Sequence, residues 1–451
     1  MCEDMKNKGH VLLLPLPLQG HINPMLQFGK RLVSKGLKTT LATTVYLSKS
    51  MHMNHCKVGI ETISDGFDET GPLWSQEIYF LTLKEVGSRT LGELIKKFSC
   101  SNEPITGLVC DSNLSWGLDV GKEFGLVTAH LYTQPCGVSS IFYHIYKGSL
   151  SVPVKESTVY LPGLPPLALH DLPSSVVTGE ERDMRFLLGQ FSNVNKADWL
   201  LFNTFDDLES EIVKWMGSLW RVRTIGPTTP SMYLDKPIEG DMENSICLFK
   251  PSEGNYLKWL NAKETGSVLY IAFGSLAELG EQQMQEIIRG IKKSGKDFLW
   301  VVRETEQSKL PEGFIEEMVE KGLIVPWCSQ LEVLDHEAIG CFLTHCGWNS
   351  TIEALSLGVP MVAMPQIWDQ LTNAKFIEDV WKIGLRVMKD DKGIVRGEEL
   401  QLCIKEIMEG ERGKLIKTNA SRWKELAKNA MDAGGSSDLN IEEFVTSVTY
   451  I

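Results

Sequence analysis

The sequence contains no long hydrophobic run and no excess of positive charge. No stretch approaches the roughly 20 consecutive apolar residues that a membrane-spanning helix requires, so we expect no membrane span. The formal net charge of −13 argues against nucleic acid or an anionic membrane as the main partner. The apolar run at residues 11–18 is short, contains Pro15 and Pro17 and precedes no small-residue cleavage site. We therefore do not interpret it as a signal peptide.

Paired cysteines and several cofactor motifs are also missing. The ten cysteines show no paired framework, which is typical of reduced thiols and predicts a cytoplasmic protein. No Gly-x-Gly-x-x-Gly follows the first predicted strand, as a dinucleotide-dependent oxidoreductase requires, and the Gly-x-Ser-x-Gly of a hydrolase is absent. Cys341, His345 and Cys346 suggest a zinc site only weakly, because adjacent residues at a strand end do not easily face one ion. We predict no metal and no cofactor.

The remaining composition is that of a globular chain with more than one core. At 451 residues, with 43% hydrophobic and 23% charged residues, two domains are the expected organisation. Short apolar runs alternate with longer amphipathic stretches, such as residues 24–35 and 281–294, and this alternation occurs twice. The strands predicted in the first half cover residues 10–16, 39–45, 59–64, 106–111, 128–132, 199–203 and 222–225. Those of the second half cover residues 267–273, 298–302, 322–326, 341–344, 360–364 and 384–388.

Most of these runs are nearly continuous rather than alternating, as expected for parallel strands that are covered on both faces. The sequence therefore predicts an α/β fold made of two Rossmann-like, doubly wound domains facing across a cleft, the usual place for a ligand. We place the first domain at residues 1–235, a linker at 236–255 and the second domain at 256–437. A C-terminal helix at 438–451 is expected to pack back on the first domain. We expect a monomer.

The first predicted strand leads directly into Gly20-His21-Ile22-Asn23-Pro24. Pro24 suits the first turn of the following helix, and Gly20 permits a close backbone approach. His21 then lies at the carboxyl end of the strand, where a histidine is suited to act as a general base. A single histidine is more often structural, so position alone leaves both interpretations open.

Asp111 ends another predicted strand and therefore opens on the same edge of the sheet. A carboxylate there could orient the second nitrogen of the His21 ring. It could equally cap the helix that follows Ser112.

The segment 327–370 contains a strand, a glycine-containing turn and a helix N-terminus. This order creates an anion site, because free backbone amides and the positive end of the helix dipole point out of the sheet. We expect the helix at residues 351–357, with Asn349 and Ser350 capping it or donating to phosphate. Glu353 is expected in the first helical turn, where its carboxylate could accept from a pair of ribose hydroxyls. Asp369 and Gln370 follow another strand end and suit sugar hydroxyls.

The same segment resembles, almost end to end, the donor-binding box of plant family 1 UDP-dependent glycosyltransferases, which runs from a Trp to a Gln over about 44 residues. The resemblance extends over the whole chain, in order: the histidine motif, the strand leading to Ser275, this box and the C-terminal helix. It implies a GT-B fold and an inverting, metal-independent transfer from a UDP-sugar. UDP-glucose is the expected donor substrate, because Gln370 and Trp348 match glucose users. His21 and Asp111 match the catalytic pair of the family.

The resemblance also implies donor contacts, residue by residue. Trp327 matches the residue that stacks on uracil, and the backbone of Cys328 matches the partner of the uracil edge. Gln330 and Glu353 match ribose contacts. The matches to phosphate contacts are His345, Asn349, Ser350 and Ser275. The matches on the sugar side are Trp348, Asp369 and Gln370. Gly20 and Gly347 are also expected to contact the donor.

The acceptor is less well marked. Acceptor-side loops of this fold come mainly from the first half, where the large apolar candidates are Trp74, Tyr79, Phe80 and Phe142, each of which could instead be core. Trp368 stands where smaller residues are common and is added to them. The stretches at 171–173, 203–205 and 231–235 resemble the plant subgroup that acts on phenolic acids, triterpenoids and steroids. We expect a small hydrophobic acceptor, a steroid or triterpenoid first and a phenolic acid or flavonoid second. A protein that binds a UDP-sugar without catalysis is the alternative from a different class.

Overall fold

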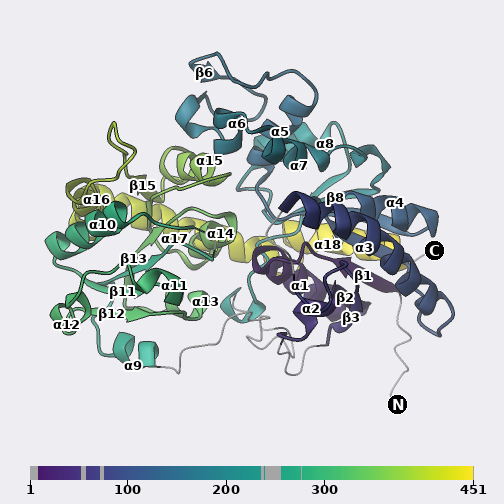
Figure 1. Cartoon of the computed structure of the whole chain (residues 1–451), viewed down its shortest axis with the longest axis horizontal. Coiled ribbons are helices and arrows are strands. Elements are labelled where there is room, and N and C mark those ends of the chain that lie inside the picture. Colours follow the sequence, from purple (N-terminus) through teal and green to yellow (C-terminus); the bar gives the residue numbers. More distant parts are fainter. Residues whose placement is uncertain are drawn as a thin grey trace. The chain divides into compact units, whose positions relative to one another are not determined.

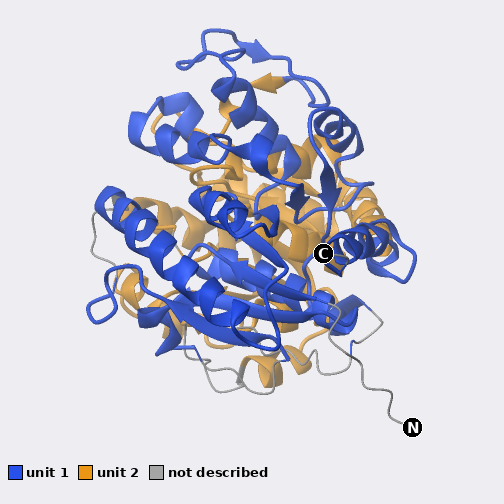
Figure 2. Cartoon of the chain, turned by 90° about the vertical axis from the view of Figure 1, so that its right-hand side faces the viewer, with its two compact units in different colours: residues 1–166, 175–248, 428–451 blue, residues 167–174, 249–427 orange. Residues whose placement is uncertain are grey.

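The computed structural model describes residues 9–51, 57–71, 76–234, 238, 255–275 and 277–449. The chain forms two compact units (Figure 2). Unit 1 comprises residues 1–166, 175–248 and 428–451, and unit 2 comprises residues 167–174 and 249–427. Most of the linker expected at 236–255 lies outside the described residues, so the domain limits there stay a prediction. The sequence contained no sign that residues 167–174 belong to unit 2.

Unit 1 is built on a seven-stranded parallel sheet with the order β3-β2-β1-β4-β5-β8-β9 (Figure 1). Its strands are β1 His10–Leu14, β2 Lys38–Thr44, β3 Gly59–Ile63, β4 Gly107–Asp111, β5 Val127–Tyr132, β8 Trp199–Phe202 and β9 Val222–Thr224. Two short strands, β6 Thr158–Val159 and β7 Leu167–Ala168, lie outside the large sheets.

The interior strand β1 is buried on both faces. Val11 and Leu13 belong to the apolar cluster that includes helices α1 and α18. Leu12 and Leu14 belong to a different cluster, with α3 and α4. Successive side chains of a strand point to opposite faces, so the unbroken apolar run of β1 serves two helical layers at once.

The helices of unit 1 are α1 Gln19–Ser34, α2 Val45–Ser48, α3 Gln76–Ser99, α4 Trp116–Glu123, α5 Cys136–Tyr146, α6 Ser174–Thr178, α7 Glu181–Gly189, α8 Ser210–Gly217 and α18 Ser436–Thr449. The short 3-10 turns are η1 Leu169–Asp171, η2 Val194–Lys196 and η3 Ser231–Leu234; η1 and Ser174 belong to unit 2. The C-terminal helix α18 packs on unit 1 through Ile441, Phe444 and Val448. Its Asn440 amide donates to the carbonyl of Thr224 at the end of β9 (3.0 Å).

Unit 2 is built on a six-stranded parallel sheet with the order β12-β11-β10-β13-β14-β15. Its strands are β10 Val268–Ala272, β11 Asp297–Val301, β12 Gly322–Val325, β13 Ile339–Thr344, β14 Met361–Ala363 and β15 Gly384–Arg386. Its helices are α9 Asn255–Asn261, α10 Glu281–Ser294, α11 Glu304–Gln307, α12 Phe314–Glu317, α13 Gln330–Leu334, α14 Trp348–Leu357, α15 Gln370–Lys375, α16 Gly397–Glu409 and α17 Glu411–Met431, with a π-helical turn, η4, at Phe376–Val380. The last residues of α17, from Lys428 on, belong to unit 1.

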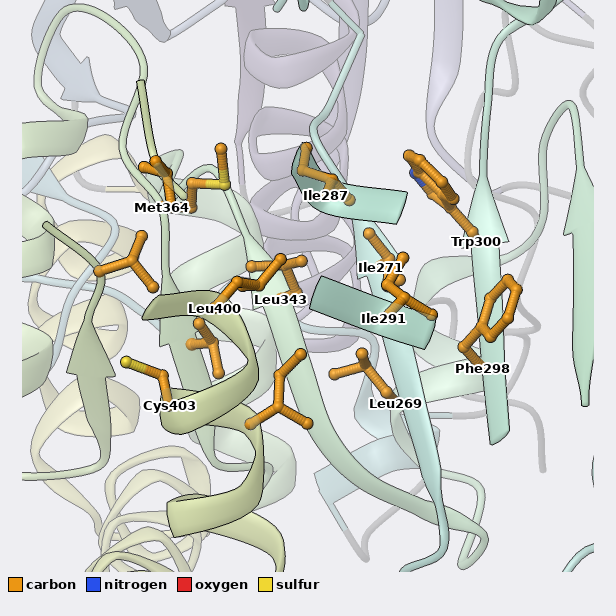
Figure 3. Close-up of a cluster of buried hydrophobic side chains, with 14 of the residues drawn as sticks. Leu269, Ile271, Ile287, Ile291, Phe298, Trp300, Leu343, Met364, Leu400 and Cys403 are labelled. Carbon is orange, nitrogen blue, oxygen red and sulfur yellow. The ribbon is translucent and has the colours of Figure 1, made fainter. Parts of the chain in front are cut away.

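One face of this second sheet is covered by α10 and α16. Figure 3 shows Ile287 and Ile291 of α10 against the strand residues Leu269 and Ile271, with Leu400 of α16 beside them. On the other face, the rings of Tyr270 and Phe342 stack with their centroids 4.8 Å apart. Both rings are buried, so this face is covered at these positions too.

The predicted fold class is confirmed, and each strand expected from the sequence corresponds to an observed strand of the two large sheets. Two helix starts were predicted wrongly. Helix α1 begins at Gln19, so Pro24 lies inside the helix rather than in its first turn. Helix α14 begins at Trp348 rather than at Thr351. In the part of the chain that the structure describes, no helix is long and apolar enough to cross a membrane.

We predict that Phe444→Ala lowers the free energy of unfolding of unit 1 by about 3–5 kcal/mol, because it removes a fully buried ring that packs on Trp199 and Phe28. Leu439→Ala on the same helix is the matched control, since this side chain is 53% exposed, and we expect a change within about 0.5 kcal/mol. Chemical denaturation followed by fluorescence measures both. Equal effects of the two substitutions would show that α18 does not contribute to the core.

Candidate active site

In unit 1, two neighbouring parallel strands bring a histidine and an aspartate together. Leu14 of β1 is in register with Cys110 of β4, so the residues after them emerge at one edge of the sheet. His21 lies in the first turn of α1, which starts from this edge. Its Nδ1 is 2.6 Å from Oδ2 of Asp111, the last residue of β4.

The aspartate is fully buried, whereas the histidine side chain is 22% exposed. Burial by itself raises the pKa of Asp111, but the charge and hydrogen bond of His21 and the donors of Asn113 outweigh it, so the pKa of Asp111 is lower than usual. Oδ1 of Asp111 accepts from the backbone N–H and the side-chain amide of Asn113 (3.0 and 3.2 Å). The ionised carboxylate is therefore held in place from both oxygens.

The hydroxyl of Thr133, which follows β5, lies 2.9 Å from Nδ1 of His21. With an ionised Asp111 as the closer partner, Nδ1 carries the proton. The unprotonated Nε2 is then the basic nitrogen of the ring. Sequence reasoning missed Thr133 and Asn113, although the position of Thr133 directly after a predicted strand was a usable signal.

In unit 2, β13 leads through a tight turn into α14. Cys346 adopts a left-handed conformation (φ 65°) and Gly347 is the N-cap of the helix. Of the two roles left open for Asn349 and Ser350, that of helix cap is wrong, because the helix begins earlier than expected, at Trp348, with Gly347 as its N-cap. Both residues lie in its first turn, where backbone amides are not used within the helix.

Glu353 therefore lies in the second turn, not in the first as expected. The side-chain amide of Gln330 donates to its Oε2 (2.6 Å) and to Oγ of Ser350 (3.0 Å). Three side chains predicted to contact the nucleotide are thus joined in one network. Burial raises the pKa of Glu353 to about 7, although the hydrogen bond from Gln330 opposes this.

The His345 ring lies between two glycines. A Cβ at Gly274 would come within 2.6 Å of its Nε2, and a Cβ at Gly347 within 2.5 Å. Gly274 also has φ +72°, which L side chains rarely adopt. Burial lowers the pKa of His345 to about 4, so the ring is neutral at neutral pH.

The uracil-side positions differ in exposure. Trp327 is half-buried, and Cys328 is buried with its Sγ near the hydroxyl of Tyr270 (3.6 Å). The thiol of Cys328 points into the core, and burial raises its pKa to about 12, so the backbone of this residue is the part left for a ligand. Ser275 is exposed, and its carbonyl accepts from the guanidinium of Arg303, another residue that sequence reasoning missed.

The three residues predicted to bind the sugar, Trp348, Asp369 and Gln370, make different contacts in the structure. Gln370 is buried, and its Oε1 accepts from the backbone N–H groups of Gln366 (2.9 Å) and Ile367 (3.0 Å). Asp369 accepts from the amide of Asn373 (2.8 Å). The ring of Trp348 is 4% exposed and packs on Trp381 instead of standing out from the turn.

The acceptor candidates are mixed. Trp74 lies outside the described residues. Tyr79 and Phe142 are buried, and the Tyr79 hydroxyl donates to Asp65 (3.0 Å), so both are core residues in this structure. Phe80 is half-buried and stacks on Phe186, whereas Trp368 is 38% exposed.

The last of the predicted donor-binding positions is Gly20. Gly20 is exposed in the first turn of α1, next to His21. Among the residues that the structure describes, no group of three or more His, Cys, Asp or Glu could hold a metal ion.

Comparisons with known proteins agree with this arrangement. Residues 216–429 match the family described as "UDP-glucoronosyl and UDP-glucosyl transferase". Mogroside I-E synthase from Siraitia grosvenorii is 49% identical over 446 residues, covering 98% of both chains. Flavonol 7-O-beta-glucosyltransferase UGT74F1 from Arabidopsis thaliana is 46% identical over 453 residues, covering 98% of this chain and 99% of the relative.

Among solved structures, Os79 from O. sativa in complex with UDP superposes with a TM-score of 0.92 at 38% identity, covering 97% of this chain and all of the other. The chain belongs to the plant family 1 UDP-glycosyltransferases of the UGT74 type, with the GT-B fold. It is an enzyme with a UDP-sugar donor, so the alternative of a non-catalytic binding protein is set aside.

The raised pKa of Glu353 predicts a pH-dependent stability. Between the ordinary carboxyl pKa of 4.5 and about 7, the folded protein keeps a proton that the unfolded chain releases. Stability is therefore lost as the pH rises through this window, and no further loss occurs above it. In the ligand-free protein, we expect Glu353→Gln to gain melting temperature relative to the parent between pH 5 and pH 8.

Differential scanning fluorimetry at a series of pH values measures this difference. The control is Glu316→Gln in the same unit, whose carboxylate is exposed to water in the folded and in the unfolded chain. A difference between parent and Glu353→Gln that stays constant with pH would contradict the prediction.

Proposed function

We propose that this enzyme is an inverting, UDP-glucose-dependent O-glucosyltransferase that adds β-glucose to a hydroxyl of a small hydrophobic plant metabolite. The observation that carries the proposal is the 2.6 Å hydrogen bond between His21 and Asp111, which leaves Nε2 of the histidine as a base at the edge of the sheet. The family relationship supports the donor class.

The proposed reaction is a single displacement. Nε2 of His21 takes the proton of the acceptor hydroxyl as its oxygen forms a bond to C1 of the sugar. The bond between C1 and the β-phosphate oxygen breaks, and UDP leaves with that electron pair. The proton remains on the imidazolium, which the buried, ionised Asp111 stabilises. Attack from the face opposite UDP converts the α-linked donor into a β-glucoside.

Unit 2 supplies the donor site in this proposal. The first turn of α14 presents backbone amides and the positive end of the helix dipole to the diphosphate, where negative charge increases as UDP leaves. The network of Gln330, Ser350 and Glu353 offers one carboxylate and one amide to the ribose hydroxyls. These residues can stabilise the leaving group without a metal ion, so we propose a metal-independent transfer.

The acceptor class is proposed from the exposure of two apolar residues. The acceptor-side residues Phe80 and Trp368 are accessible and apolar, which favours a hydrophobic aglycone. A steroid or triterpenoid hydroxyl is our first proposal. A flavonoid or phenolic acid is the second, because one of the relatives is named a flavonol glucosyltransferase. We also propose that the enzyme acts in the cytoplasm.

We predict that His21→Ala lowers kcat by roughly 10²–10⁴-fold, because the base is lost, while the Kd for UDP stays unchanged. Asp111→Asn should lower kcat by up to about 10⁴-fold, because the neutral amide neither fixes the tautomer nor stabilises the imidazolium. Steady-state kinetics with UDP-glucose and calorimetry with UDP separate the two quantities. His336→Ala is the control, a histidine of unit 2 whose ring bonds to the side chain of Asn261 and to the backbone N–H of Ala338 and has no role in the proposed reaction. Full turnover by His21→Ala would refute the mechanism.

We further predict that a panel of steroid, triterpenoid, flavonol and salicylate-type acceptors with UDP-glucose yields steroid or triterpenoid β-glucosides with the highest kcat/KM. Mass spectrometry identifies the products, and the anomeric proton coupling in NMR distinguishes β from α linkage. Turnover of phenolic acceptors alone would replace the first acceptor proposal by the second. An α-glucoside would contradict the inverting displacement.

A further inference from the structure

The chain enters unit 2 once in the middle of unit 1, at residues 167–174, which we call the strap. It contains β7, the turn η1 and Ser174, and Figure 2 colours it with unit 2. It also contains the Asp-Leu-Pro of residues 171–173, a motif for which the proposed reaction provides no role. The contacts of the strap lie next to the predicted sugar-binding residues.

The centre of the strap is a buried, charged anchor. The side chain of Asp171 is 2% exposed. Its Oδ1 accepts from Arg386 of β15 (2.7 Å), and its Oδ2 lies 3.5 Å from Nζ of Lys375 in α15. The backbone carbonyl of Asp171 accepts from the hydroxyl of Thr372 (2.7 Å), also in α15. The strap is therefore tied to the helix that begins with Gln370.

The end of the strap holds the loop before that helix. The N–H of Ser174 donates to the carbonyl of Trp368 (3.0 Å), and the N–H of Trp368 donates to Oγ of Ser174 (2.7 Å). These two hydrogen bonds fix the backbone of Trp368, whose φ of 55° is a left-handed conformation that is unfavourable for a bulky side chain. Such a conformation persists only where its surroundings enforce it.

Trp368 directly precedes Asp369 and Gln370, the two residues predicted to bind the sugar. Asp369 follows Trp368 in the chain and is the N-cap residue of α15. Gln370 uses its Oε1 to hold the N–H groups of Gln366 and Ile367, so only its amide nitrogen remains to donate to a sugar hydroxyl. The direction of that nitrogen depends on the path of the loop 366–369. The strap binds this loop through Ser174, and α15 binds it through the side chain of Gln370.

We propose that Asp171 and Ser174 are positioning residues for the donor sugar: through Trp368 and α15 they set the orientation of Asp369 and Gln370. This inference rests on the proposed function, in which that pair binds glucose. The inference predicts that substitutions in the strap affect the two ends of the donor differently. The sugar end depends on the strap, whereas the uridine end, held by the β13–α14 turn and Gln330, does not.

The test uses Ser174→Ala, which removes the hydroxyl that accepts from Trp368, and Asp171→Asn, which removes the charge facing Arg386 and Lys375. We expect both to lower kcat/KM for UDP-glucose by roughly ten- to hundredfold, since small misplacements of a substrate cost this much. The preference for UDP-glucose over UDP-galactose should fall as well. The Kd for UDP, measured by calorimetry, should change by less than about threefold, and Ser174→Thr, which keeps a hydroxyl, should restore activity.

Two matched controls lie elsewhere in unit 2. Ser294→Ala removes a buried hydroxyl that donates to Ile291, and Glu286→Gln neutralises a buried carboxylate paired with Arg289 and Arg396. If the strap variants behave like these controls in UDP-glucose kinetics, the inference is wrong. It is also wrong if the strap variants lose UDP affinity in proportion, because that would indicate general damage to the unit.

Gln370→Ala distinguishes the failure of this inference from the failure of the proposed function. If Gln370→Ala changes the donor preference and the strap variants do not, the strap has no positioning role and the proposed sugar site stands. If Gln370→Ala leaves kcat/KM and the donor preference unchanged, the proposed sugar site is wrong and the inference falls with it.

Discussion

The short hydrogen bond between His21 and Asp111 depends on one constraint, the parallel pairing of β1 with β4. Parallel neighbours end at the same edge of a sheet, so residues about 90 positions apart meet without any local sequence relationship. The pairing requires strands that are apolar on both faces, and helices must cover each face. The apolar run of β1 therefore supports the fold and the position of His21, the proposed base, at the same time.

The same constraint operates in unit 2 with a different outcome. The strand β13 ends at Thr344, and a short turn with the left-handed Cys346 leads into α14 at Trp348. The chain therefore presents a helix N-terminus with backbone amides at this strand end. The turn after β13 requires glycine at two positions around His345, because a side chain at Gly274 or Gly347 would collide with the His345 ring. One architecture thus yields the proposed catalytic pair in one unit and the proposed phosphate site in the other.

Much of this could be predicted from local patterns. Continuous apolar runs of strand length, separated by amphipathic stretches, predicted the strands of both large sheets and the α/β class correctly. Helix starts were less predictable. Asn349 and Ser350 are good capping residues by type, yet the backbone turn at Cys346 places the cap at Gly347, and conformations of this kind depend on packing around the turn. For Tyr79 and Phe142, exposure could not be deduced from residue type, because large apolar side chains suit cores and pockets equally.

The sequence alone determined the strand positions, the two-fold repetition of the βα pattern and, through the 327–370 segment, the family of the enzyme. These are properties of short-range order, where periodicity and residue type are sufficient. Only the tertiary structure decided that Thr133 and Asn113 contact His21 and Asp111, the proposed catalytic pair. It also decided that Gln330 joins Ser350 and Glu353, and that residues 167–174 belong to unit 2 and bind the backbone of Trp368. Such contacts connect residues distant in the chain, and their partners are selected by packing rather than by any local pattern.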